Sequence, residues 1–180
     1  MTIAVLLKQV PDTTAKISVS GNRVDEGAVA KWSMSPYDEY ALESALQVKG
    51  SVGGDLVAIT AGPVRCEKLL RDAAAVGADT LVHVSVDDIG ALDSTQVQAL
   101  LAAAVSKSGA NVVFCGKQAA DTNSGSTGPG VAEILNAACV TLVSEVSSDG
   151  GGFIATRPSA AGQEKVGVNS PCVFAFDKGL

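Results

Sequence analysis

The chain has 180 residues, enough for one domain with a buried core, and it carries a net charge of −6. This acidic balance argues against a nucleic-acid partner, because proteins that bind a nucleic-acid backbone need a basic surface. Hydrophobic residues make up 47% of the chain and charged residues 18%, which excludes a disordered protein. No stretch reaches the roughly 20 apolar residues of a membrane span. We therefore expect a single domain over residues 1–180 with no membrane span.

The N-terminal segment predicts a buried strand rather than a signal peptide. Residues 3–8 (IAVLLK) are a short continuous apolar run with no basic segment before them. A cytoplasmic location is expected, or the mitochondrial matrix in a eukaryote, although no transit peptide is present. Residues 16–24 then alternate around Ser20-Gly21-Asn22, which predicts a small peripheral hairpin.

The first predicted helix has a clear start. Ser35 stands at the N-cap, Pro36 at the first helical position and Asp38 at the third. Gly50 can close this helix. Its apolar face comprises Ala41, Leu42, Ala45 and Leu46.

Two further strand and helix units follow. The strands are expected at residues 56–60 and 80–86, and the helices at residues 64–76 and 94–107. A glycine stands just after each of these helices and can end it, and Asp93 can cap the second one.

A fourth strand, residues 111–115, leads into the most distinctive segment of the chain, residues 116–130 (GKQAADTNSGSTGPG). Thr127 can cap the helix that follows, and its apolar stripe comprises Val131, Ile134 and Leu135. The first-turn N–H groups of a helix lack internal partners and favour a phosphate. By itself, the loop fits a phosphate site and an ordinary strand-to-helix connection equally well.

The remaining strands, at residues 140–146 and 171–176, flank a glycine-rich turn. Strands that alternate with helices predict an α/β fold: a three-layer α/β/α, doubly wound, mostly parallel sheet of the Rossmann-like, adenine-nucleotide-binding type. If the first and fourth strands are neighbours, the loops at residues 9–13 and 116–127 diverge there and open a crevice. Residues 35–38 and 61–63 can line the same edge of the sheet.

Few side chains offer reactive chemistry. The one histidine, His83, lies in an alternating strand and is expected to be packed there, and the four cysteines are expected to be small buried hydrophobes with no metal. Lys117 either touches a phosphate, caps a carboxylate or stays on the surface. Asp121 either accepts from a ribose or adenine or holds the loop as an Asx turn. No Walker-type or dinucleotide-dehydrogenase motif follows the first strand, so we assign no catalytic residue.

Taken together, the segments IAVLLKQVPDT, MSPYDEYALESAL, AGP, RDAAAVGAD and GKQAADTNSGSTGP, in that order, resemble the β subunit of electron-transfer flavoprotein, and VFAFDKGL also looks like the family. The resemblance implies a heterodimer with an α subunit, which takes electrons from dehydrogenases and passes them to a quinone reductase or another acceptor. It implies an electron carrier rather than an enzyme. AMP is the implied ligand of the β subunit, with FAD held by or shared with α, or a second FAD in place of AMP.

The resemblance also implies the contact residues. Backbone amides of Gly125, Ser126 and Thr127 would hold the phosphate, and Thr13 would face the flavin of α. Asn123 and Ser126 replace an aspartate and a glutamine that are usual in the family. The other nucleotide contacts carried over are Leu6, Ser35, Pro36, Tyr37, Asp38, Ala61, Gly116, Lys117, Gln118, Asp121, Asn123 and Ser124.

The family continues beyond DKGL into a recognition loop and a C-terminal arm, so the chain is expected to be a short form without them, either naturally short or truncated after Leu180. An alternative is a stand-alone adenine-nucleotide-binding regulatory protein of the stress type. A pyrophosphatase-like hydrolase or ligase is less favoured, because no Ser-Gly-Gly loop follows the first strand.

Overall fold

The computed structural model describes residues 1–148 and 150–178. A six-stranded parallel sheet with the order β7-β6-β1-β8-β13-β9 forms its centre. The fold class predicted from the alternation of strands and helices is thereby confirmed. The strands are β1 (Thr2–Leu6), β6 (Asp55–Gly62), β7 (Thr80–Ser85), β8 (Val112–Gly116), β9 (Ala138–Val143) and β13 (Cys172–Phe176).

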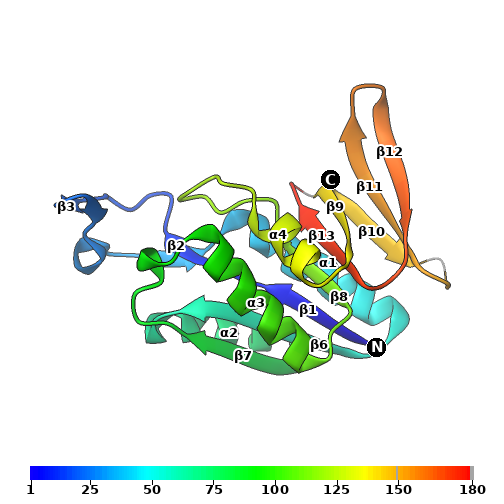
Figure 1. The fold of residues 1–180 in the computed structure, drawn as a ribbon, viewed down its shortest axis with the longest axis horizontal. Helices are drawn as coiled ribbons and strands as arrows, with labels where there is room; N and C mark the ends of the chain where they lie inside the picture. The colour runs from blue at the N-terminus through cyan, green and yellow to red at the C-terminus, as the bar shows by residue number, and fades with distance from the viewer. Residues whose placement is uncertain (149, 179–180) are drawn as a thin grey trace.

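Helices cover both faces of this sheet because alternate residues of each buried strand point to opposite sides. Ile3 and Val5 of β1 pack in one core with α1 (Pro36–Val52) and α2 (Glu67–Val76). Ala4 and Leu6 pack in a second core with α3 (Ser94–Ser108) and α4 (Thr127–Ile134). Figure 1 shows α3 and α4 in front of the sheet, with α1 behind it.

The sheet reverses its winding direction at β1. The chain runs from β1 to β6 and then β7 on one side, and it returns to the other side of β1 with β8. Val5 is in register with Ala58 on one neighbour and with Phe114 on the other. The first and fourth predicted strands are therefore adjacent, as the crevice hypothesis required.

The predicted starts of α1 and α3 are confirmed, but the end of α1 is not. Asp93 caps α3 through a reciprocal pair of bonds with Gln96, and Gly109 ends it with φ 74°. Gly50 lies inside α1, which continues to Val52 and ends at Gly53, whose φ is 74°. The helix continues past Gly50 because Val52 still packs against the core.

Two details of the prediction for α4 are wrong. Ser126, not Thr127, stands at the N-cap, and Ile134 is 49% exposed instead of packing on the sheet. The helix is short, and Asn136 turns the chain away with φ 51° directly after it. Only the face around Val131, which is fully buried, therefore reaches the sheet.

A second, antiparallel sheet was not predicted. It consists of β10 (Glu145–Ser148), β11 (Phe153–Ser159) and β12 (Gly162–Val168). The expected strand at residues 140–146 is divided at Ser144 between β9 and β10. The β11–β12 hairpin projects from the body (Figure 1), and its mixed polar sequence gave no strand signal.

The segment after β1 leaves and rejoins the sheet edge. Strand β2 (Gln9–Pro11) pairs with β5 (Trp32–Met34), and the predicted peripheral hairpin lies between them as β3 (Val19–Ser20) and β4 (Arg23–Val24). Short 3-10 helices are η1 (Glu26–Ala28), η2 (Val64–Cys66) and η3 (Ile89–Ala91). No helix in residues 1–148 and 150–178 is long and apolar enough to cross a membrane.

Candidate functional site

A cavity of about 430 Å³ opens at the carboxyl ends of β1 and β8, where the sheet reverses direction. Its wall combines the end of β1, the loop after β8, the start of α3 and part of the segment between β2 and β5. Doubly wound sheets bind ligands at this position because the loops on either side of the reversal diverge. Those loops lie together at the left in Figure 1.

The structure brings more than half of the predicted contact residues to this cavity. They come from β1, the start of α1, the end of β6, and the loop that runs from β8 to α4. Those that line it are Leu6, Asp38, Ala61, Gly116, Gln118, Asp121, Ser124, Gly125 and Thr127.

The other predicted contact residues are not part of the cavity lining. Ser35 is fully buried and its Oγ has no partner in the described residues. Gln118 Nε2 donates to Asn123 Oδ1 at 2.9 Å, which closes the loop on itself. Thr13 is exposed on the segment after β2. Pro36, Tyr37, Lys117 and Ser126 complete this set.

Asp38 holds the two strands at the reversal point together. Its Oδ1 accepts the N–H of Gly116 and its Oδ2 accepts the N–H of Lys8, both at 2.8 Å. Burial raises the pKa of this carboxyl to about 7, although the two N–H donors oppose the shift. A Cβ on Gly116 would lie 2.5 Å from Asp38 Oδ1, so this close approach requires glycine.

Asp121 is neutralised by a cation that sequence reasoning missed. Lys8 Nζ lies 2.7 Å from Asp121 Oδ1, and both residues line the cavity. The pair bridges the crevice from the end of β1 to the loop after β8. Lys8 is the last residue of the predicted strand 3–8, at the end that faces the crevice, and this position was a signal that could have identified it.

Lys117 caps a carboxylate, one of the alternatives left open by its sequence context. Its Nζ lies 2.9 Å from Asp177 Oδ2 and 4.9 Å from the centroid of the Tyr37 ring. The bond to Asp177 raises the pKa of Lys117. Burial would raise the pKa of Asp177, but the hydrogen bonds from Lys117 and the Lys178 N–H outweigh it and lower that pKa. Lys117 thereby ties the loop after β8 to the end of β13.

The N-terminus of α4 offers free donors to the cavity. The N–H groups of Gly125, Ser126 and Thr127 donate no hydrogen bond within the part of the chain that the structure describes. Gly125 has φ 66°, a conformation that favours glycine. A Cβ on Gly128 would lie 2.9 Å from Cys115 Sγ, so α4 starts unusually close to the sheet. Backbone N–H groups without partners at the start of a helix are the kind of donor that anions favour.

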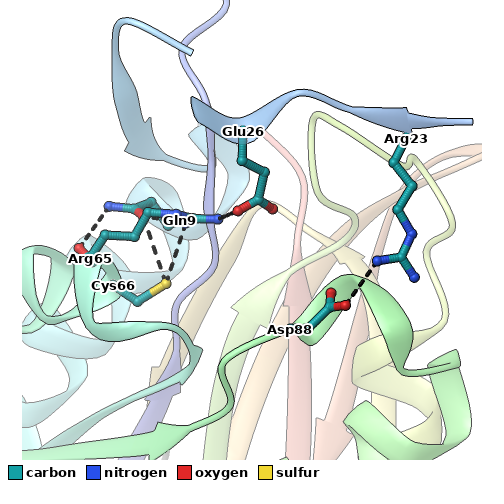
Figure 2. A network of polar contacts seen from close by, with 6 residues as sticks. All are labelled: Gln9, Arg23, Glu26, Arg65, Cys66 and Asp88. Carbon is teal, nitrogen blue, oxygen red and sulfur yellow. Dashed lines mark hydrogen bonds and ion pairs between the residues drawn. The ribbon is translucent and has the colours of Figure 1, made fainter. Parts of the chain in front are cut away.

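The far end of the cavity carries a second polar cluster, which the sequence did not indicate. Arg65 lies with its guanidinium carbon 3.7 Å from the centroid of the Trp32 ring, and its Nη1 donates to Gln9 Oε1 at 2.6 Å. Gln9 Nε2 in turn donates to the Arg65 carbonyl at 3.1 Å. Figure 2 shows this cluster with Cys66 beside it. The single tryptophan of the chain was the available signal.

The remaining candidates are structural. His83 Nε2 lies 2.8 Å from the Gly62 carbonyl oxygen, as expected of a packed strand residue. Cys66, Cys115 and Cys172 are buried, and burial raises the pKa of each thiol. Cys139 is exposed, contrary to the expectation for the cysteines, because it lies in the edge strand β9.

The comparisons with known proteins agree with this architecture. A family profile described as the electron transfer flavoprotein domain matches residues 27–180. The chain belongs to the electron transfer flavoprotein family. The electron transfer flavoprotein β subunit of Clostridium acetobutylicum is 35% identical over 182 residues, which covers 100% of this chain and 70% of that protein. The human β subunit is 33% identical, over 97% of this chain and 70% of its own length.

A relative with a different name is also an electron transfer subunit. The acryloyl-CoA reductase electron transfer subunit gamma of Anaerotignum propionicum is 33% identical, over 97% of this chain and 66% of its own length. The chain thus spans 66% to 70% of the length of these relatives. Within the electron transfer flavoprotein family, the chain is a β-type subunit.

Proposed function

We propose that this β-type chain binds an adenine nucleotide, AMP or the adenylate half of FAD, in the cavity at the sheet reversal. The main support for this proposal is the start of α4. There, Gly125 and Thr127 line one end of the cavity, and their backbone N–H groups donate no hydrogen bond within the described residues. The phosphate of the nucleotide would lie there, held by backbone N–H groups and by the positive end of the helix dipole.

The acidic side chains of the cavity are compatible with this ligand. Asp121 would repel a phosphate, but its ion pair with Lys8 offsets that charge. Asp38 uses both oxygens on backbone N–H groups, and its raised pKa lowers its mean charge near neutral pH. The phosphate would therefore meet less negative charge than the sequence suggests.

We further propose that the chain works in electron transfer as the partner of an α-type subunit, with a flavin at their junction. Membership in the electron transfer flavoprotein family supports a flavin. The chain's own residues would bind and orient the nucleotide and carry out no bond-making step. Electrons would come from dehydrogenases and leave to a quinone reductase or another acceptor.

Analysis of the bound nucleotide tests the proposal. Protein purified without added nucleotide is denatured, and the extract is separated by chromatography; AMP or FAD is expected at close to one per chain. Calorimetric titration with AMP is expected to give a saturable signal after the nucleotide is removed. A folded protein that carries no nucleotide, binds neither AMP nor FAD and does not associate with a co-expressed α-type subunit would refute it. A homodimer that binds ATP without a flavin would favour the stand-alone regulatory alternative.

A further inference from the structure

Residues 12–31 form a strap at the carboxyl edge of the sheet, and both ends of the strap are fixed. Pro11 pairs with Trp32 in the β2–β5 ladder. The Asp12 N–H donates to the Lys31 carbonyl at 3.0 Å, and Lys31 Nζ lies 2.8 Å from Asp12 Oδ2. Between these ends the strap leaves the sheet and carries the β3–β4 hairpin and η1 (Figure 1).

The body of the strap is weakly attached to the rest of the molecule. Among residues 13–30, all of which the structure describes, only Val29 is buried. Their backbone hydrogen bonds remain within the strap; for example, the Asp25 N–H donates to the Ser18 carbonyl at 2.9 Å. Segments with few buried groups and mainly local hydrogen bonds open at a low cost in free energy.

Two ion pairs tie the strap to opposite sides of the cavity. Arg23 Nη1 lies 2.9 Å from Asp88 Oδ2, just before η3, and Glu26 Oε2 lies 2.9 Å from Arg65 Nη2 in η2. Figure 2 shows the Arg23 side chain pointing toward Asp88 and the Glu26 side chain pointing toward Arg65. Within the described residues, these are the only ion pairs or side-chain hydrogen bonds that join residues 13–30 to groups beyond the strap.

The strap and its anchoring points also line the cavity. Val24 and Glu26 contribute from the strap, and Arg65 and Ile89 contribute from the two anchored sides. Cys66 lies next to Arg65, is 3% exposed and also lines the cavity. Displacement of the strap would therefore remove one wall and expose the interior, including Cys66.

We propose that the strap is a latched cover, which the ion pairs Arg23–Asp88 and Glu26–Arg65 hold closed over the cavity. The Arg23 and Asp88 side chains are 56% and 60% exposed, so their pair is weak and screened by salt. The latch is thus suited to open and close repeatedly. It deepens the proposed function, since a nucleotide would enter and leave under it, yet opening can be measured without any nucleotide.

Alkylation of Cys66 by iodoacetamide, followed by peptide mass spectrometry, measures the opening. Exposed Cys139 serves as an internal reference in the same protein. Arg23→Gln and Asp88→Asn are the informative variants, because among the described residues Arg23 and Asp88 form no hydrogen bond or ion pair with Cys66. Glu26 is left unchanged, since its charge contributes to the raised pKa of the Cys66 thiol and its removal would alter the reactivity directly.

Each variant is expected to accelerate Cys66 labelling about two- to fivefold, the range for loss of an exposed ion pair, with Cys139 unchanged. Salt at molar concentration should accelerate Cys66 labelling in the wild type and do so less in Arg23→Gln. The swapped pair Arg23→Asp with Asp88→Arg should restore slow labelling. Lys68→Gln, which breaks the exposed Lys68–Asp72 pair on α2, is the matched control and should have no effect.

Equal rates of Cys66 labelling in the wild type, Arg23→Gln and Asp88→Asn would overturn the proposal of a latch. So would an acceleration that Lys68→Gln shares or that the swapped pair fails to reverse. Failure of AMP to bind would instead refute the proposed nucleotide site, and the labelling rates would still decide the latch.

Discussion

Asp38 and Gly116 are joined by a buried 2.8 Å hydrogen bond from the Gly116 N–H to the Asp38 carboxylate, although they lie 78 residues apart in the chain. The bond connects the start of α1 to the end of β8. With the matching bond from Lys8, it fixes the distance between the ends of β1 and β8, after which the diverging loops create the cavity. One carboxylate thus sets the geometry of the candidate site.

The raised pKa of Asp38 should make the free energy of unfolding depend on pH. Because its pKa is raised to about 7 when folded, the folded state keeps a proton that the unfolded state loses near pH 4. Its contribution to the free energy of unfolding should therefore fall as the pH rises from about 4 to about 7, by up to about 4 kcal/mol, and level off above. Asp38→Asn removes this dependence.

Urea unfolding of the wild type and Asp38→Asn across this pH range provides the measurement. The difference between the two unfolding free energies should decline toward pH 7 and stay constant above it. A constant difference from pH 4 to pH 8 would show that the buried carboxyl titrates alike in both states.

The pair between Lys117 and Asp177 should contribute to stability more than to ligand binding. The two side chains are 22% and 27% exposed, so a double-mutant cycle with Lys117→Met and Asp177→Asn should give a coupling of about 1 kcal/mol. Urea unfolding measures the coupling, and calorimetry with AMP should show a dissociation constant within about twofold of the wild type, since such a change is under 1 kcal/mol. A large loss of AMP affinity with no coupling would place Lys117 on the nucleotide instead.

Gly125→Ala should weaken AMP binding beyond its effect on stability. Gly125 has φ 66°, and its N–H is one of the free donors at the start of α4. The variant should lose about 1–2 kcal/mol of stability from backbone strain, and about tenfold or more in AMP affinity because the donor moves. Gly109→Ala is the matched control, with φ 74°, no atom near its added Cβ, and a position at the far end of α3.

Both variants should lose similar stability in urea, while only Gly125→Ala should lose affinity in calorimetric titration. Equal AMP affinity in the two variants would show that the start of α4 does not bind the phosphate.

Truncation of Phe114 in the core is expected to be costly. Its ring is fully buried, and its centroid lies 5.5 Å from those of both Phe174 and Phe176 on the adjacent strand β13. Phe114→Ala should lower the free energy of unfolding by about 3–5 kcal/mol, because it leaves a cavity and removes aromatic contacts. A loss below 1 kcal/mol in urea unfolding would mean that the strands collapse to fill the space.

Local chemistry made several parts of this fold predictable. Pro36 after Ser35 determined where α1 begins, and Asp93 determined the same for α3, since capping acts within one turn of the chain. The β11–β12 hairpin was missed because alternation of polar and apolar residues is weak there, and its pairing depends on Phe153 reaching the common core. Similarly, Gly50 lies mid-helix because the packing of Val52 outweighs a local stop signal.

The sequence by itself determined the alternation of the central parallel strands with their helices, the glycine-rich loop before α4 and the family resemblance, because these depend on periodicity, caps and motif order along the chain. Only the tertiary structure decided which charges meet. The pairs Lys8–Asp121 and Lys117–Asp177, and the ion pairs of the strap, join residues far apart in sequence. These partners come from segments far apart along the chain, which are brought together only when the crossover connections place the strands side by side in the sheet.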